Sequence, residues 1–427
     1  MSIFGKLVPG MISTGLDIGS SAIKLVQLQR TKEGVSLHKA GSAPTPAGAM
    51  KAGVVVDPLA MAQAVRSLLE ALQIDGGMAV AGVAGPTVVV REVPLPTMSD
   101  RQLRKSIQWE ARNYISFPVE DSVVEFEVLD RPANQTSGHM RVMLVAAPRD
   151  MVDSQVETLE LAGLEPVAVE TQPFAAMRGL SAANGQLRAP GETTALLEMG
   201  ASYTEITIVK DGHFVLSRMI PIAGNAFTEA IKTALDISLD EANQLKEKAM
   251  QVVLSEEERA TLDPAAQQAS RAIEPHLDEL IREVRRSLAY HDYQQQSPDA
   301  AAGELGVSQI LLSGGSAKLP HVASYFQAQL GVPVSIVNVF GAGNVQAHGV
   351  NQDYLEAHAP ALLVSTGLAL REALLAKAGR RSASRPPGGV STPLGLTPPQ
   401  AQSSGEDSRA AAVRDRSQSS EAHHDSM

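Results

Sequence analysis

The stretch TGLDIGSSAIKLVQL, residues 14–28, is the starting point for understanding this chain. A short apolar run ends in an acid, a glycine turn follows, and a second β-like run carries one cation. The polar members are one acid, one glycine, two hydroxyls and one amine: Asp17, Gly19, Ser20, Ser21 and Lys24. Such a hairpin can wrap a phosphate, because glycine lets backbone N–H groups approach the anion and serine adds donors. The acid would face a metal ion, and the lysine would contact a phosphate oxygen. On the residues alone, a plain hairpin turn and a snorkelling lysine stay open as alternatives.

The same pattern occurs a second time. LEMGASYT, residues 197–204, repeats LDIGSSAI, residues 16–23, in register. Each copy continues as a strand to a polar glycine turn, at residues 32–34 and 210–212, and a third apolar strand follows each turn. A repeat of this kind indicates a duplicated unit. Two phosphate hairpins facing each other across a cleft are the arrangement of the actin-like, ribonuclease H-like nucleotide-binding fold.

The second turn supplies the candidates for activity. It offers an acid, two small residues and two hydroxyls: Glu198, Gly200, Ala201, Ser202 and Thr204. Glu198 stands where the pattern has aspartate, and its longer side chain reaches Mg²⁺ through water but changes the geometry for activating a water. Glu170 ends the strand that joins the two halves, where it either orients an attacking water or is an ordinary strand-end acid. The candidate catalytic residues are therefore Glu170 and Glu198, and the candidate Mg²⁺ ligands are Asp17 and Glu198.

A third group of residues is suited to an adenosine. The turn Ser313-Gly314-Gly315 follows an apolar strand, so the backbone can pass flat against a base or ribose. The other candidates are a glycine before a helix, two residues on the next helix and one lysine after the turn: Gly224, Lys246, Glu247 and Lys318. For the pair on the helix, a solvated helix face is an equal alternative.

Composition excludes several classes of protein. The 427 residues are 44% hydrophobic but only 4% aromatic, they include no cysteine, and the net charge is −11. Disulfides and thiolate sites are excluded, and a nucleic-acid surface is not expected. No HExxH, GxSxG or GxxxxGK[ST] motif occurs. The chain has no convincing signal peptide and no apolar span of about 18–20 residues, so we expect a cytoplasmic protein that reaches a membrane only through partners.

The predicted class is α/β, with a duplicated two-domain core, a small inserted α/β subdomain and a disordered tail. The predicted segments are an arm, 1–13; a first actin-like domain, 14–94 with 169–190; an inserted subdomain, 95–168; a second domain, 191–235 with 305–379; its subdomain, 236–304; and the tail, 380–427. The tail is rich in Ser, Pro and Gln and has few bulky apolar residues.

The inserted segment carries the only tryptophan. Ser99 with Gln102 predicts a capping box, and the helix that follows has one apolar stripe. Trp109 falls on the other side of that helix. Two interpretations stay open: Trp109 packs against the first domain, or it forms a contact surface for a partner.

Several stretches resemble the PilM family of type IV pilus assembly proteins. They are LDIGSSAIKLVQL, SIQWEARNYISFPVEDSVVEFEVL, VMLVAAPRDMVDSQVETLELAGLEP, the SGG turn and STGLALR, and together the resemblance covers roughly residues 14–375. It implies an actin-like protein that binds ATP and Mg²⁺, is close to the cell-division protein FtsA, and docks at the inner membrane through the N-terminal tail of PilN. It also implies contacts with other pilus assembly platform proteins and motor ATPases. In that family the PilN peptide lies between the first domain and the insert, so Trp109, Tyr114 and Phe117 are candidate partner contacts. The family usually has aspartate at the position of Glu198. Nucleotide binding is still expected, because backbone N–H groups make most of the phosphate contacts, but ATP hydrolysis is expected to be at most slow.

Two other functions stay open. An FtsA-like filament protein would end in an amphipathic membrane helix, which residues 380–427 do not contain. A small-molecule kinase of the same fold would need a substrate cleft with a base beside the phosphate, and the insert resembles a small α/β module instead. The sequence does not fix the oligomeric state, and a homo-oligomer is one open alternative.

Overall fold

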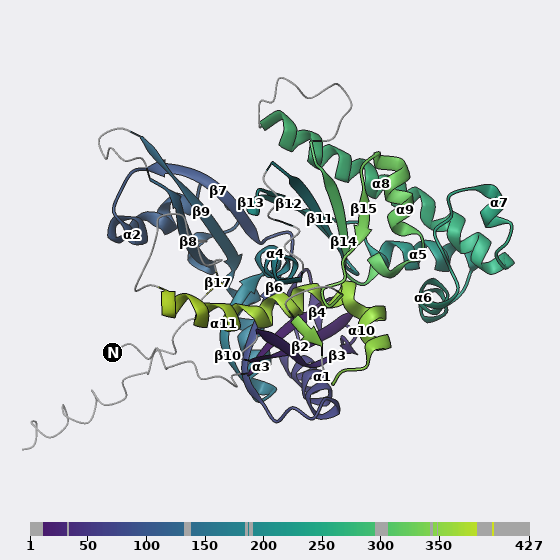
Figure 1. The fold of residues 1–427 in the computed structure, drawn as a ribbon, viewed down its shortest axis with the longest axis horizontal. Helices are drawn as coiled ribbons and strands as arrows, with labels where there is room; N and C mark the ends of the chain where they lie inside the picture. Colours follow the sequence, from purple (N-terminus) through teal and green to yellow (C-terminus); the bar gives the residue numbers. More distant parts are fainter. Residues whose placement is uncertain are drawn as a thin grey trace, which may run out of the picture.

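The computed structural model is a two-lobed molecule in which each lobe is built on one sheet covered by helices (Figure 1). The described residues are 12–31, 34–131, 138–183, 187, 191–294, 306–341, 345–347, 349–381 and 395–396. Within these ranges no helix has the length and apolar character needed to cross a membrane.

The first lobe contains a seven-stranded sheet in the order β16-β3-β2-β1-β6-β10-β17. Strands β1, β2 and β3 form an antiparallel meander, and β6 and β10 continue the sheet in parallel with β1. The bounds are β1 (Ile12–Ile18), β2 (Ala22–Arg30), β3 (Val35–Pro44), β6 (Gly77–Val83), β10 (Leu164–Thr171), β16 (Val345–Ala347) and β17 (Gly395–Leu396).

The second lobe repeats this plan in a five-stranded sheet, in the order β13-β12-β11-β14-β15. Its bounds are β11 (Thr193–Met199), β12 (Thr204–Lys210), β13 (His213–Ile220), β14 (Gln309–Ser313) and β15 (Val334–Ile336). The helices of this part are α5 (Gly224–Leu235), α6 (Leu239–Lys248), α7 (Glu256–Arg259), α8 (Pro264–Gln294) and α9 (Val322–Leu330). An antiparallel meander followed by a parallel strand thus occurs twice, which confirms the predicted duplicated actin-like fold.

The inserted subdomain is a three-stranded sheet, β7-β9-β8, with one α-helix and a short 3₁₀ helix (Val119–Asp121). Its elements are β7 (Val89–Pro96), α2 (Asp100–Ala111), β8 (Ser122–Asp130) and β9 (His139–Pro148). Ser99 and Gln102 form the expected capping box at the start of α2. The sheet begins earlier than the sequence boundary at 95, because β7 pairs with β9 along its whole length.

Residues 149–168 lie with the first lobe, although the sequence assigned them to the insert. Helix α3 (Arg149–Leu161) packs on α1 (Pro58–Ala71), β6 and β10. β10 itself pairs with β6. The amphipathic pattern of α3 identifies a helix but not the sheet that the helix covers, because that contact is distant in sequence.

The chain returns to the first lobe after β15. There β16 pairs with β3, and α11 (Leu363–Arg381) packs against β1, β2 and α4 (Gln172–Ala183). The sequence placed all of 305–379 in the second domain. Two glycines permit the close packing of α11: a Cβ on Gly15 would lie 2.0 Å from the Ser365 carbonyl oxygen, and one on Gly367 would lie 1.7 Å from the Ala175 carbonyl oxygen.

Gly367→Ala is expected to lower the free energy of unfolding by about 3 kcal/mol, because the added methyl group forces α11 away from α4. Urea unfolding followed by circular dichroism measures the loss. Gly315→Ala is the matched control, since a Cβ there would meet nothing within 4 Å. Equal stability of the two variants would contradict the packing of α11 on α4.

The predicted arm and tail fall largely outside the described residues. Strand β1 begins at Ile12, inside the predicted arm. In the segment from 380 onward, α11 continues to Arg381 and residues 395–396 form β17, which pairs with β10. These short pieces differ from the prediction of disorder throughout.

Candidate functional site

The first predicted phosphate turn links β1 to β2. The Gly19 N–H donates to the Ala22 carbonyl at 3.1 Å, and the Thr45 hydroxyl donates to the Gly19 carbonyl at 2.6 Å. Ser20 and Ser21 are exposed. The turn is therefore held closed by its own backbone, and both serines lie on its outer surface.

The second turn, between β11 and β12, has the same construction. The Gly200 N–H donates to the Tyr203 carbonyl at 3.0 Å, and the Ser316 hydroxyl donates to the Gly200 carbonyl at 2.8 Å. The bonds match those of the first turn, with Ser316 taking the part of Thr45. The two turns are therefore equivalent in structure as well as in sequence.

The second turn is also fastened to the start of α5. The N–H of Asn225 donates to the Ala201 carbonyl at 2.8 Å, and its side-chain amide donates to the Ser202 hydroxyl at 3.2 Å. Thr204 is buried and donates to the Ile222 carbonyl at 2.7 Å. The Thr204 hydroxyl thus links the end of the second turn to the segment before α5.

Charged groups from both lobes meet between the turns. The Lys24 amine lies 2.9 Å from Asp17 Oδ2, and the Gln172 amide donates to Asp17 Oδ1 at 2.8 Å. Burial lowers the pKa of Lys24, but the negative charges of Asp17 and, more weakly, Glu198 outweigh it, so the pKa of Lys24 is raised. Lys24 of the first lobe and Glu198 of the second therefore interact electrostatically across the two lobes.

Glu198 ends β11 on the second-lobe side of this centre. It accepts a hydrogen bond from the Ser313 hydroxyl at the end of β14. Burial raises the pKa of Glu198 to about 8, and the negative charges of Asp17 and Glu205 add to this, against Ser313 and Lys24, which lower it. Glu198 thus holds a proton at neutral pH in the absence of a cation.

The role of Asp17 and Glu198 as magnesium ligands stays a prediction, and both oxygens of Asp17 already accept hydrogen bonds, from Lys24 and Gln172. Among the described residues, no cluster of three or more His, Cys, Asp or Glu side chains is arranged to hold a metal. Mg²⁺ commonly takes one or two carboxylates and fills its shell with water and phosphate oxygens. Two carboxylates at the phosphate turns therefore suit an ion that arrives with a nucleotide.

The glycine turn after β14 lies against the second phosphate turn. Gly314 has a φ of +89°, and a Cβ there would lie 2.4 Å from the Met199 carbonyl oxygen. Gly315 is exposed, and a Cβ there would meet nothing within 4 Å. Lys318 is exposed at the end of the same short 3₁₀ helix (Ser316–Lys318). Position 314 requires glycine because of its positive φ and its close approach to Met199, whereas the space beside Gly315 is open to a ligand.

Lys246, on α6, contacts the first turn of α5. Its amine donates to the Thr228 hydroxyl at 2.6 Å and to the Gly224 carbonyl at 3.3 Å. Burial lowers the pKa of Lys246, which Glu247 opposes more weakly. Glu247 accepts from the Asn243 amide at 3.0 Å. Thus Gly224 and Lys246 lie together near the second turn, while Glu247 is engaged along its own helix.

Glu170 is fully buried and paired. Both carboxylate oxygens accept hydrogen bonds from Arg178 on α4, and Arg178 also donates to the Gly367 carbonyl at 2.8 Å. This ion pair joins β10, α4 and α11. Its role in orienting a water stays a prediction, and the carboxylate already has a structural partner.

Two residues of this region were missed by the sequence reasoning. Gln172 donates a hydrogen bond to Asp17. The sequence feature that could have identified Gln172 is its position directly after the strand that carries Glu170. Glu205 lies opposite Glu198 in the β11–β12 ladder. Burial raises the pKa of Glu205 to about 7, against a hydrogen bond from Ser217 that lowers it. No motif indicated this second buried acid.

The three candidate partner contacts lie on the inserted subdomain, away from the turns. Trp109 is 67% exposed, and the Arg112 guanidinium lies 4.8 Å from its ring centroid. Tyr114 is half-buried with Arg91 6.0 Å from its ring centroid, and Phe117 is half-buried. Trp109 therefore does not pack against the first lobe, which removes the first interpretation of its position.

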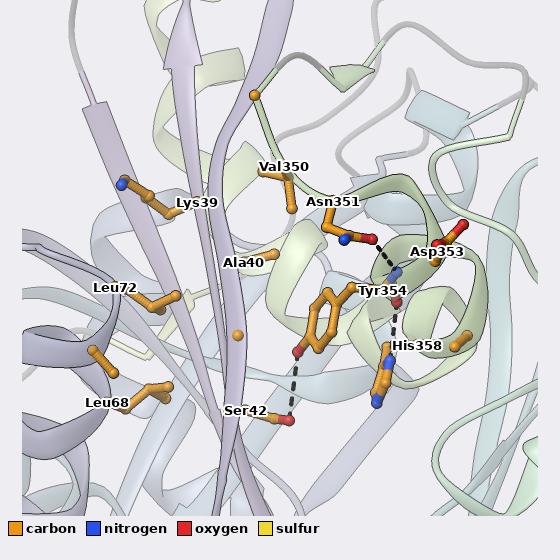
Figure 2. A pocket seen from close by; sticks show the side chains of 14 residues that line it. Lys39, Ala40, Ser42, Leu68, Leu72, Val350, Asn351, Asp353, Tyr354 and His358 are labelled. Atoms are coloured by element: carbon orange, nitrogen blue, oxygen red, sulfur yellow. Dashed lines mark hydrogen bonds between the residues drawn. The ribbon is translucent and has the colours of Figure 1, made fainter.

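A groove of about 790 Å³ lies elsewhere on the first lobe, between β3, α1 and α10 (Gln352–His358) (Figure 2). The Tyr354 ring stacks on His358, with centroids 4.3 Å apart, and its hydroxyl donates to Ser42 at 3.5 Å. None of the sequence-predicted site residues lines it. This groove is therefore separate from the nucleotide site that the sequence predicts at the two turns.

Comparison with known proteins places the chain in a family. The model for the family described as "Type IV pilus assembly protein PilM" matches residues 15–373. The solved structure of a PilM–PilN type IV pilus biogenesis complex is 30% identical, covers 85% of this chain and 99% of that chain, and superposes with a TM-score of 0.71. Cell division protein FtsA of Bacillus subtilis (strain 168) is 23% identical and covers 78% of this chain and 80% of its own length. FtsA of Streptococcus pneumoniae serotype 2 is 25% identical and covers 76% of this chain and 74% of its own length. The chain belongs to the PilM family of type IV pilus assembly proteins.

Proposed function

We propose that this protein is a nucleotide-binding adaptor of the type IV pilus assembly platform. It holds ATP with Mg²⁺ between its two phosphate turns and binds the N-terminal cytoplasmic peptide of PilN. It works in the cytoplasm at the inner membrane, which it reaches through that peptide. The observation that carries the proposal is the pair of equivalent turns, with Asp17 and Lys24 on one side and Glu198 on the other.

The phosphate groups of the nucleotide lie at the two turns. Backbone N–H groups and the hydroxyls of Ser20, Ser21 and Ser202 are donors for phosphate oxygens, and Lys24 supplies a positive charge. The ribose and base lie above Gly315, where no side chain interferes. Lys318, at the end of the short helix after Gly315, and Lys246, beside Gly224, are the cations that we assign to the nucleotide in the second lobe.

Asp17 and Glu198 would hold the Mg²⁺, which would screen the charge of the phosphates. Glu198 loses its proton when a cation binds, since a coordinating carboxylate must be ionised. Because this site has glutamate and because Glu170 is paired with Arg178, turnover of ATP is slow or absent. Nucleotide then acts mainly by stabilising one closure angle between the lobes.

The partner peptide lies between the first lobe and the inserted subdomain. Support comes from the similar solved structure, whose title names a PilM–PilN complex. On the insert, Trp109 is exposed beside Arg112, and Tyr114 and Phe117 are half-buried nearby in the sequence. Aromatic and arginine side chains are the residues that protein interfaces favour. Closure of the lobes links nucleotide to the affinity for the peptide.

Gly315→Leu is expected to weaken Mg·ATP binding by about tenfold or more, equivalent to about 1.4 kcal/mol. The added side chain fills the space for the ribose and base, and its Cβ meets no protein atom within 4 Å. Calorimetric titration measures the affinity, and Gly315→Ala is the graded control with a small expected loss. Unchanged affinity in Gly315→Leu would place the nucleotide elsewhere.

The same titrations with the PilN peptide test the adaptor function, with Trp109 fluorescence as a second readout. We expect peptide affinity to differ with and without Mg·ATP. The FtsA relatives make a filament-forming protein the second candidate function. Sedimentation with Mg·ATP separates the two, because a filament pellets and an adaptor stays in the supernatant.

A further inference from the structure

Two sheet edges face each other where the first lobe meets the inserted subdomain. β8 is one of the two edge strands of the inserted sheet, and β10 is the last strand before β17 at one end of the first sheet. Strand β17, residues 395–396, pairs antiparallel with β10 and also contacts β8 (Figure 1). A short piece of the C-terminal tail therefore occupies the space between the two edges.

The pairing has a defined register. Leu396 lies opposite Val169, and Gly395 lies opposite Glu170. An uncovered edge strand offers a row of backbone N–H and C=O groups to any extended chain. Addition of a strand to such an edge is a common way to bind a peptide. The tail segment thus makes the kind of contact with β10 that an extended partner would make.

The sequence of this segment suits a short strand in an otherwise polar tail. Leu394 and Leu396 are the only leucines among residues 382–427, and Gly395 separates them. Pro393 and Pro398 bracket the segment, and proline cannot continue a ladder of backbone hydrogen bonds. From these prolines we expect any strand formed here by the tail to be short.

One polar group beside this edge has no partner within the described residues. Thr171 is fully buried, and its hydroxyl makes no hydrogen bond there. It is the next residue of β10 beyond the pair formed by Glu170 and Gly395. An extended peptide longer than β17, in the same register, would continue the backbone pairing past Glu170 to Thr171.

We propose that the tail segment at Gly395–Leu396 is an intramolecular strand that covers a peptide-docking edge of β10, and that an extended partner peptide displaces it. The inference rests on the proposed function, because it takes the PilN peptide as the displacing chain. Residues 382–394 connect α11 to β17 and span at most about 45 Å. A tether of this length gives a local concentration of about a millimolar, so even a weak strand competes with a free peptide.

Gly395→Pro in the full chain tests the strand itself. Proline at this position removes a backbone donor and prevents regular pairing. We expect hydrogen–deuterium exchange of residues 164–171 to become about threefold faster or more. Gly405→Pro, in the same tail but outside β17, is the matched control and should leave exchange unchanged. Identical exchange in wild type and both variants would overturn the proposal.

The competition is tested by binding of the synthetic PilN peptide. Gly395→Pro should raise the affinity about fivefold or more, and Gly405→Pro should not. A reversible disulfide should change the peptide affinity in the opposite direction. Val169→Cys combined with Leu396→Cys places two cysteines opposite each other in the β10–β17 pairing, in a chain with no other cysteine. Oxidation should block peptide binding, and reduction should restore it.

The two proposals fail in different ways. Equal peptide affinity in all variants, with unchanged exchange, would overturn the tail strand and leave the adaptor function intact. No peptide binding by any variant, with faster exchange in Gly395→Pro, would overturn PilN as the displacing partner and keep the covering strand. Peptide binding that persists in the oxidised double variant would place the peptide away from β10.

Discussion

Glu170→Ala is expected to lower the free energy of unfolding by about 3–5 kcal/mol. The substitution leaves the guanidinium of Arg178 buried without its anionic partner, and side-chain exposure in this pair is 4% for Arg178 and 0% for Glu170. The same guanidinium donates to the Gly367 carbonyl, so the packing of α11 weakens as well. Urea unfolding followed by circular dichroism measures the effect.

Two controls separate the ion pair from other roles of this position. Glu165→Ala changes an exposed acid on the same strand and should cost less than about 0.5 kcal/mol. Glu170→Met combined with Arg178→Met removes both charges and should recover much of the lost stability. A Glu170→Ala protein that is as stable as wild type but has lost ATP turnover would instead make Glu170 a water-orienting group.

Glu198→Gln is expected to stabilise the nucleotide-free protein at pH 8–9 and to change little at pH 5. Burial raises the pKa of Glu198 to about 8 from an ordinary value of 4.5, so the folded protein holds this proton more tightly than the unfolded chain. The resulting contribution to stability is fully present below about pH 4.5 and is lost as the pH rises through about 8. The difference at pH 9 should be on the order of 2 kcal/mol, because the half-buried side chain keeps part of its hydration.

Thermal unfolding of wild type and variant across this pH range measures the difference. Glu205→Gln should behave in the same way over a window that ends near pH 7, since burial raises the pKa of Glu205 to about 7. Glu165→Gln, at an exposed site, should follow wild type at every pH. A Glu198→Gln protein whose stability parallels wild type from pH 5 to pH 9 would show that Glu198 is ionised throughout.

The duplicated turns could be predicted because their pattern is local. The acid, the glycine and the hydroxyls lie within a few residues of one another, and the bonds that close each turn join Gly19 to Ala22 and Gly200 to Tyr203. The capping box at Ser99 is local in the same sense. Such features depend on neighbours that the sequence displays directly.

The features that were missed depend on distant neighbours. Glu170 has the sequence of a strand-end acid, and only the packing of α4 on β10 brings Arg178 to it. The alternation in β7 identifies a strand but not its partner β9, about 50 residues away. The STGLALR stretch contains small residues, which permit close packing. Nothing near it in the sequence indicates that α11 packs on β1 of the first lobe instead of on the second domain, where the sequence placed it.

The path of the chain between the lobes has a mechanical consequence. The polypeptide crosses once between α4 and β11, returns once between β15 and β16, and both of its outer portions end on the first lobe. The lobes also share a buried apolar cluster, in which Leu196 and Leu311 of the second sheet pack with Val80 of the first. Two chain crossings restrict sliding and twisting of one lobe on the other, and any rotation about them must be accommodated by this cluster. We therefore expect a nucleotide held between the turns to act on the angle between the lobes, about the line through the two crossings.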